Sequence, residues 1–254
     1  MGHPNNLAGY LNLVLPFALG CYVLGHDRWK KLSGWTLGLG FMALLCTQSI
    51  GGTAAFVLVL VLSIFCFIRS RKKRLVLLAG LCALICLAYL LRAILNPVHT
   101  EGYIGSDAVS RLMLWGTAWD EFTQSPVFGI GWGNFGAPYD WNISFAPGMG
   151  EPHNIYLQLL AETGLMGFVA FFYLVVQSGR QAWSQLHSSI DFPDRALAFG
   201  VLGALLSVSV HGFIDIPFFA QSGTLLWVLL ALLVASGRLQ QGPGVFHEQS
   251  VGRS

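Results

Sequence analysis

The stretch EPHNIYLQLLAETGLMGFVAFFYLVV, residues 151–176, decides the fold class. After four residues that include a charge, a proline and a histidine, it runs into apolar residues as far as Val176, with Glu162 partway along. About 20 mainly apolar residues are enough for a helix to cross the hydrocarbon core of a bilayer. The stretch therefore predicts a membrane-spanning helix over 155–176 whose first residues are polar.

The composition of the whole chain agrees with a membrane protein. Of its 254 residues, 54% are hydrophobic and only 10% are charged, whereas an average soluble domain has roughly 25% charged residues. The mean hydropathy is +0.62. The five cysteines all fall inside apolar runs, at spacings that indicate neither a disulfide framework nor a metal site. These features exclude a soluble module on a single anchor and predict that the chain itself is the membrane domain.

Apolar runs of the length of a membrane span recur along the chain. We expect seven such helices, at 7–25, 33–50, 53–68, 75–95, 155–176, 196–214 and 218–236. The fold predicted is an all-α, polytopic membrane bundle. Its expected parts are four helices in 1–95, an outer loop at 96–154, three helices in 155–236 and a tail at 237–254.

Lysine and arginine are concentrated in every second connection, as in 28–31 and 69–74. Cytoplasmic loops are enriched in these residues, so the basic connections belong on the cytoplasmic side. The segment 96–154 then lies outside, as does the amino terminus. Because an outer amino terminus without a signal sequence is unusual, we expect an odd number of further helices before Met1 in the functional protein.

The outer segment combines aromatic residues with glycine and proline. Residues 107–122, DAVSRLMLWGTAWDEF, predict an amphipathic helix that Asp107 caps and that ends before Pro126. This helix fits either an interfacial position or the floor of a cleft in which aromatic rings stack on sugars and Arg111 holds an anion. The glycines that follow, at 129, 131, 133 and 136, lack the βαβ context of a nucleotide site and predict close approach of the backbone to a ligand or to the bilayer.

Ionisable residues at or inside the membrane are costly, so those on the outer side are functional candidates. His153 is expected in the first turn of its helix, where the helix dipole favours an anion, although a simple His–Asn cap fits equally well. Glu162 is expected roughly 13 Å further along the helix as a buried hydrogen-bond partner. His211 and Asp215, spaced i and i+4, are expected on one helix face within reach of each other, as a proton-transfer pair or a structural pair.

Four stretches carry a resemblance to a known family. They are GHPNNLAGYLNLVLPFAL at 2–19, RLMLWGTAWDEFTQSPVFGIGWGNF at 111–135, EPHNIYLQLLAETGLMGFVAFF at 151–172 and HGFIDIPF at 211–218. In order and spacing the chain resembles the O-antigen ligase and polymerase family of bacterial inner-membrane proteins. The resemblance implies a multi-pass glycosyltransferase of the GT-C type whose active side faces the periplasm and which needs no metal or other cofactor.

The resemblance also implies the partners. The expected donor is a glycan on undecaprenyl pyrophosphate, and the acceptor is lipid A core, another glycan chain or a protein hydroxyl. The bilayer is the third partner, and no nucleic acid is expected.

Family roles transfer to this sequence by position. Arg111 resembles the family arginine that engages the pyrophosphate, and His153 resembles the essential histidine that activates the acceptor or binds the carrier phosphate. We expect substrate contacts from Arg92, Trp115, Asn154, His211 and Asp215, and structural support from Glu162. One position departs from the family pattern, because Ile50 stands where a second arginine is usual.

Two other functions are compatible with the sequence. A helical bundle with an intramembrane glutamate could carry a solute such as bicarbonate, and a folded remnant could lack activity. Against transport, the polar residues gather at one face and do not extend through the bilayer.

Overall fold

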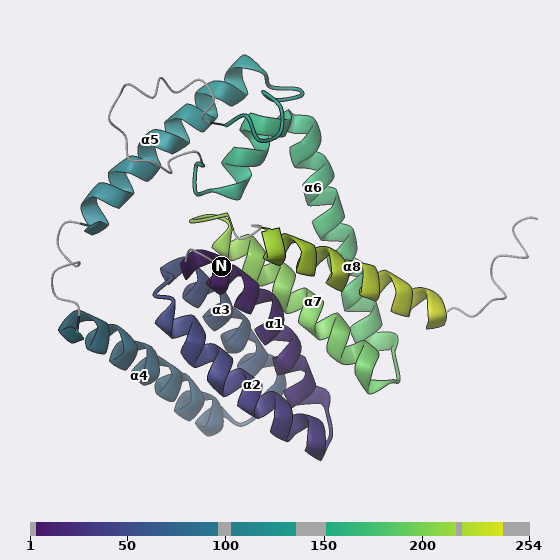
Figure 1. The fold of residues 1–254 in the computed structure, drawn as a ribbon. Helices are drawn as coiled ribbons and strands as arrows, with labels where there is room; N and C mark the ends of the chain where they lie inside the picture. The colour runs from purple at the N-terminus through teal and green to yellow at the C-terminus, as the bar shows by residue number, and fades with distance from the viewer. Residues whose placement is uncertain (1–3, 96–102, 136–150, 217–219, 241–254) are drawn as a thin grey trace, which may run out of the picture.

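The structure is a computed structural model that describes residues 4–95, 103–135, 151–216 and 220–240. Every regular element in this part of the chain is a helix, as predicted. The helices are α1 (Pro4–Leu24), α2 (Asp27–Cys46), α3 (Ile50–Phe67), α4 (Arg71–Leu95), α5 (Tyr103–Gln124), α6 (Ile155–Ser188), α7 (Phe192–His211) and α8 (Ala220–Gln240). Figure 1 shows α1, α2, α3, α7 and α8 as a bundle, with α5 and the first turns of α6 above one end of it.

Six of the described helices, α1, α3, α4, α6, α7 and α8, are long and apolar enough to cross a membrane. The helix that corresponds to the expected span 33–50 is α2, and it is not among the six. It begins six residues earlier than expected, so Asp27, Arg28, Lys30 and Lys31 lie in its first two turns. These charges lower its hydropathy, which explains why six spans are found and not the seven expected.

The amphipathic helix of the outer segment is α5, and its boundaries differ from those predicted. It begins at Tyr103, so Asp107 lies inside the helix and does not cap it. Its end at Gln124, two residues before Pro126, agrees with the prediction. Leu114 and Ala118, one turn apart, are buried against Leu157 and Ala161 of α6, so α5 is held as a second layer over the start of α6.

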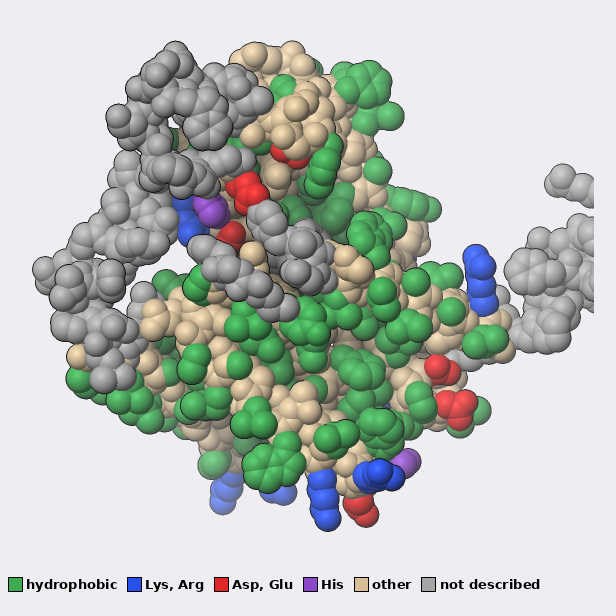
Figure 2. Space-filling model, viewed as in Figure 1, with side chains coloured by type: hydrophobic (Ala, Val, Ile, Leu, Met, Phe, Trp, Pro, Cys, Tyr) green, Lys and Arg blue, Asp and Glu red, His purple; other side chains and the backbone are tan. Residues whose placement is uncertain are grey.

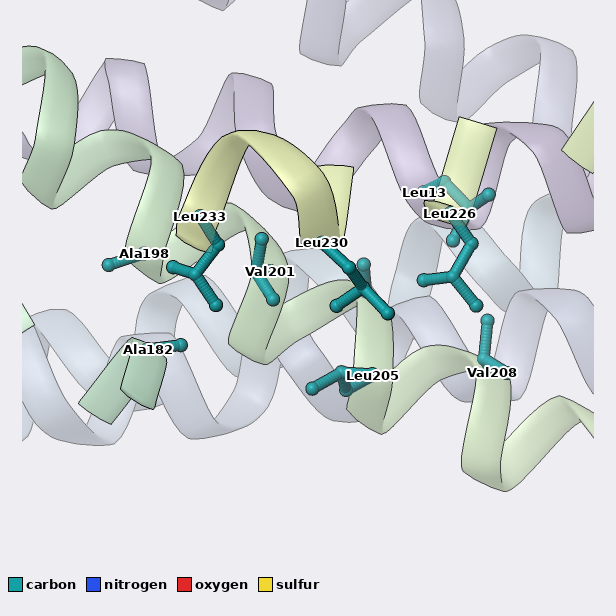
Figure 3. Packing of buried hydrophobic residues seen from close by; sticks show 10 residues of the cluster. Leu13, Ala182, Ala198, Val201, Leu205, Val208, Leu226, Leu230 and Leu233 are labelled. Atoms are coloured by element: carbon teal, nitrogen blue, oxygen red, sulfur yellow. The ribbon is translucent and has the colours of Figure 1, made fainter. Parts of the chain in front are cut away.

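Helices α1 and α7 form the centre of the bundle. The backbone of α7 passes very close to α1, because a Cβ atom at Gly200 would lie 2.8 Å from the Cα atom of Phe17. Small residues permit such close helix contacts in membrane proteins. Helix α8 covers one side of α7, where Leu226, Leu230 and Leu233 pack against Val201 and Leu205 (Figure 3).

Helix α6 is longer than predicted and is not continuous. It extends to Ser188, whereas the apolar pattern predicted an end at Val176. Gly164 has φ 62° and ψ −166°, which interrupts the helix one turn after Ala161. The continuous apolar pattern of this stretch did not predict the break.

Candidate functional site

A glycine-rich turn of the outer segment closes the break in α6. The amide groups of Ile130 and Gly131 donate to the carbonyl oxygens of Ala161 and Glu162, both at 2.9 Å. On the other side of the break, the amide of Leu165 donates to the carbonyl oxygen of Pro126 at 2.9 Å. The turn therefore satisfies the backbone groups that a helix break leaves without partners, and it fixes residues 125–135 to α6.

Two glycines make this backbone contact possible. A Cβ atom on Gly129 (φ +69°) would lie under 3.0 Å from the backbone of Glu162 and Thr163, and one on Gly164 would lie equally close to the backbone of Val127. Gly131 and Gly133 also have positive φ. At Gly129 the backbone brought close is that of α6. Gly136 lies outside the described residues.

Glu162 is buried at this junction, with 2% of its surface exposed. Its Oε1 atom accepts a hydrogen bond from the amide of Phe135 at 3.2 Å. The expectation of a buried hydrogen-bond partner agrees with this geometry, but the donor is the outer segment and not another helix of the bundle. Glu162 thus links the end of the described outer segment to α6, within one turn of Gly164.

The amino terminus of α6 is capped by Asn154. Its Oδ1 atom accepts from the amides of Tyr156 and Leu157 at 3.0 and 3.1 Å, and its Nδ2 atom donates to the carbonyl oxygen of Phe213 at 3.3 Å. His153 precedes this cap and is not in the first turn, which corrects the prediction. Because Asn154 occupies these amides, they do not form an open anion site.

His153 has a backbone conformation that non-glycine residues rarely adopt, with φ 50°. Its Nδ1 atom lies 3.2 Å from Oδ1 of Asp215. The imidazole is 28% exposed, while Asp215 is buried. Left-handed backbone at a non-glycine residue is found at sites where the surrounding structure imposes it, and here it turns the ring of His153 towards Asp215.

Asp215 is the centre of a polar cluster contributed by separate parts of the chain. Besides His153, its carboxylate accepts from Nδ2 of Asn5 on α1 and from the amide of Ile216 at 2.8 Å. His211 and Asp215 do not share a helix face as the i, i+4 spacing predicted, although the two side chains are close enough for their charges to interact. Helix α7 ends at His211 and the chain turns, with the amides of Ile214 and Asp215 both donating to the carbonyl oxygen of His211 at 3.0 Å.

His211 points instead towards α3. It is almost fully buried, and its Nε2 atom lies 3.4 Å from Oγ of Ser49. Ser49 caps α3 by accepting from the amide of Gly52 at 3.2 Å. Ile50, the departure from the family pattern, is the first residue of α3 and is 59% exposed, so the position where the family usually has arginine faces outward beside this pair.

Two residues of α5 contact the same region. The guanidinium of Arg111 donates to the carbonyl oxygen of Ile214, the neighbour of Asp215. The indole nitrogen of Trp115 donates to the carbonyl oxygen of Pro152 at 2.9 Å, next to His153. The structure thus brings Arg111 and Trp115 together with His153, Asn154, His211 and Asp215. Arg92 lies in α4, and its side chain is outside the described part.

Asn5 and Ser49 were missed by the sequence analysis. Asn5 lies in the first turn of α1 and Ser49 caps the start of α3, so both lie just before the expected spans 7–25 and 53–68. A polar residue at such a place was the available signal. Among the described residues, no group of three or more His, Cys, Asp or Glu side chains is arranged to hold a metal ion.

Burial and hydrogen bonding act in opposite directions on Asp215. Burial alone raises the pKa of its carboxyl, but the hydrogen bonds from His153 and the Ile216 amide, together with the charges of His153 and His211, leave the pKa below its ordinary value of 3.8. Asp215 is therefore ionised at neutral pH, and its carboxylate can accept a hydrogen bond from the Nδ1–H group of His153. Burial raises the pKa of the nearby Glu151, and the charges of Asp215 and Glu162 add to that rise, while His153 opposes it.

The pKa of Asp215 predicts how the stability of the protein depends on pH. A carboxyl with a depressed pKa stabilises the fold above its unfolded-state pKa, and that stability is lost as pH falls through the folded-state value. We expect Asp215→Asn to melt at a lower temperature than the wild type at pH 7, with the difference shrinking as pH falls below about 4. Thermal melting between pH 7 and 3 measures this, with Asp120→Asn, an exposed carboxylate of α5, as the control. A difference in melting temperature that stays constant with pH would contradict this dependence of stability on the ionisation of Asp215.

The sequence model of the O-antigen ligase family matches residues 35–172, which is more than half of the chain. The match includes Arg111, Trp115 and His153, whereas Asn5, His211 and Asp215 lie outside it. No curated protein with which the chain was compared matches it. The structure agrees with this match, since it is a polytopic helical bundle in which these residues gather at one end. Because the family model covers more than half of the chain, the chain belongs to the O-antigen ligase family of membrane proteins that transfer glycans.

Proposed function

We propose that this protein transfers a glycan from an undecaprenyl-pyrophosphate carrier to an acceptor hydroxyl at the periplasmic face of the bacterial inner membrane. The observation that carries the proposal is the His153–Asp215 pair, 3.2 Å from Nδ1 to Oδ1, beside a guanidinium anchored at Ile214. A base and a cation are the two groups that this transfer requires.

Asp215 sets the protonation pattern of His153. An ionised carboxylate at Nδ1 holds the proton on that nitrogen, so the lone pair of the neutral ring is on Nε2. Nε2 has no hydrogen-bond partner among the described residues, and the imidazole is partly exposed. An acceptor hydroxyl placed at Nε2 can therefore give up its proton to His153.

The transfer step follows from these positions. The hydroxyl proton moves to Nε2 of His153 as the acceptor oxygen bonds to the anomeric carbon of the donor glycan. The bond between that carbon and the pyrophosphate oxygen breaks, and the electron pair leaves with undecaprenyl pyrophosphate. Arg111 stabilises the departing charge, since guanidinium pairs with phosphate oxygens in bidentate fashion and stays protonated. His153 then releases its proton to solvent.

Other residues act through this pair. Asn5 and the amide of Ile216 hold the carboxylate of Asp215, while Trp115 holds Pro152 and Asn154 caps α6. Pro152 and Asn154, the two chain neighbours of His153, are therefore both held by hydrogen bonds. The acceptor, whether lipid A core, a glycan or a protein, is chosen by surfaces beyond these residues.

The proposal is tested by transfer from a polyprenyl-pyrophosphate glycan in proteoliposomes. We expect Arg111→Ala to lower kcat/KM for the donor by about 10²–10³-fold, as for removal of one charge-stabilising donor. Arg111→Lys retains the charge but not the planar fork and is expected to recover only part of the loss. Arg180→Ala, an exposed arginine in the last turns of α6, is the matched control and should keep wild-type transfer.

Two results would overturn the proposal. One is wild-type transfer by Arg111→Ala under conditions in which the donor is limiting. The other is solute uptake into the same proteoliposomes that depends on Glu162 while no glycan is transferred, which would establish a transporter.

A further inference from the structure

A basic segment follows α3 and continues into the first turn of α4, and it has no acidic partner in the described part of the chain. It consists of Arg69, Arg71, Lys72, Lys73 and Arg74. The first four side chains are exposed, and the first turn of α4 contains no acidic residue. Arg74 is engaged within the protein, through a bond from Nε to the carbonyl oxygen of Ile68 and a position 5.4 Å from the ring centre of Phe65.

This arrangement of charge is unfavourable for an isolated protein. Like charges three residues apart on a helix, such as Arg71 and Arg74, repel each other, and cations at the amino terminus of a helix oppose its dipole. Four of the five positive charges occupy the first four residues of α4. A negatively charged group bound at this place would stabilise the start of the helix.

An apolar surface of membrane length begins directly after these charges. The most apolar window of 18 residues within 71–91 of α4 has a mean hydropathy of 2.4, and none of it is buried in the protein. The helix packs on its neighbours through Leu81 and Ile85. Leu75 and Val76, which directly follow the basic residues, are 58% and 71% exposed, and Figure 1 shows α4 at the edge of the bundle.

The basic segment is at the far end of the bundle from the candidate site. Helix α3 begins beside His211 and has 18 residues, so its end lies about 27 Å away at 1.5 Å per residue. That separation is close to the thickness of the hydrocarbon core, about 30 Å. Figure 2 shows several lysine and arginine side chains along the lower end of the molecule, and a histidine with acidic side chains near the upper end.

We propose that the basic segment and the exposed face of α4 bind an anionic phospholipid. The phosphodiester of the headgroup lies among Arg71, Lys72 and Lys73, and the acyl chains lie along Leu75, Val76 and the apolar residues above them. A free anion would use only the charges, and an acidic soluble protein would not reach the apolar face. In an anionic phospholipid the charged headgroup is followed by hydrocarbon chains, just as the basic residues of α4 are followed by its apolar residues.

The test compares two triple variants that remove the same charges. Arg71→Gln/Lys72→Gln/Lys73→Gln alters the proposed site, and Arg28→Gln/Lys30→Gln/Lys31→Gln removes one arginine and two lysines from the start of α2. The full chain in mild detergent is titrated with phosphatidylglycerol or phosphatidylcholine, and bound lipid is counted by native mass spectrometry. Each basic residue near an anionic lipid contributes about a fivefold preference.

We expect the wild type and the α2 variant to prefer phosphatidylglycerol by at least about tenfold, and the α4 variant to lose that preference. The wild-type preference should also collapse in 1 M salt, a measurement that needs no variant. Equal binding of the two lipids by the wild type would overturn the proposal. An equal loss in the α2 variant, which would indicate diffuse charge, or full competition by soluble glycerophosphoglycerol, which would indicate a headgroup-only site, would also overturn it.

Discussion

Replacing His153 with alanine is expected to lower kcat for glycan transfer by about 10²–10⁴-fold, the range for loss of a positioned general base. Asp215 does not replace the missing imidazole, because it is buried and its carboxylate is already bonded to Asn5 and Ile216. Donor binding should change little, since Arg111 is retained. The KM for the donor should therefore stay within about threefold of the wild type while kcat falls.

His187→Ala is the matched control for this variant. His187 is an exposed histidine near the other end of α6, where Nδ1 lies 2.8 Å from the carbonyl oxygen of Trp183. It should transfer glycan at the wild-type rate. Added imidazole should restore part of the activity of His153→Ala but not of Arg111→Ala, because imidazole replaces a missing base and not a missing cation. Transfer by His153→Ala at the wild-type rate would exclude a catalytic role for this residue.

The fold could be predicted because lipid-length apolar runs and basic connections are local signals. Helices α1, α3, α4, α7 and α8 lie where the hydropathy placed them. The errors come from places where local pattern and tertiary contact differ. The first residues of α2 are charged, so the search for apolar runs did not include them in the helix. The apolar run of α6 ends at Val176 and did not indicate that the helix continues to Ser188.

The candidate site was predicted in its residue types but not in its pairings. Spacing i, i+4 placed His211 and Asp215 on one helix face, and this prediction failed because α7 ends at His211. The actual partner of Asp215, His153, is 62 residues away in the sequence and has a backbone conformation that no periodicity predicts. Asn5 and Ser49 contribute from two other helices. Pairings of this kind depend on how helix ends meet, and a single sequence does not encode that in a readable pattern.

Gly164→Ala is expected to have the largest effect on stability, a loss of about 3 kcal/mol or more. The conformation at this residue, φ 62° and ψ −166°, belongs to a region that is essentially restricted to glycine. A methyl group would also lie under 3.0 Å from the backbone of Val127. That backbone cannot move away, because Val127 accepts from the amide of Met166 at 3.2 Å and Pro126 accepts from Leu165.

Gly179→Ala, in the same helix, separates this effect from helix propensity. A Cβ atom at Gly179 would meet nothing within 4 Å, and alanine is the better helix former by about 1 kcal/mol. Thermal melting in detergent should therefore show Gly179→Ala at or above the wild type and Gly164→Ala far below it. If the two variants melted together, the break in α6 would not depend on glycine. A loss of stability in Gly164→Ala alone would show that the junction of residues 125–135 with α6, which also holds Glu162, requires glycine at this position, about three helix turns after the cap beside His153.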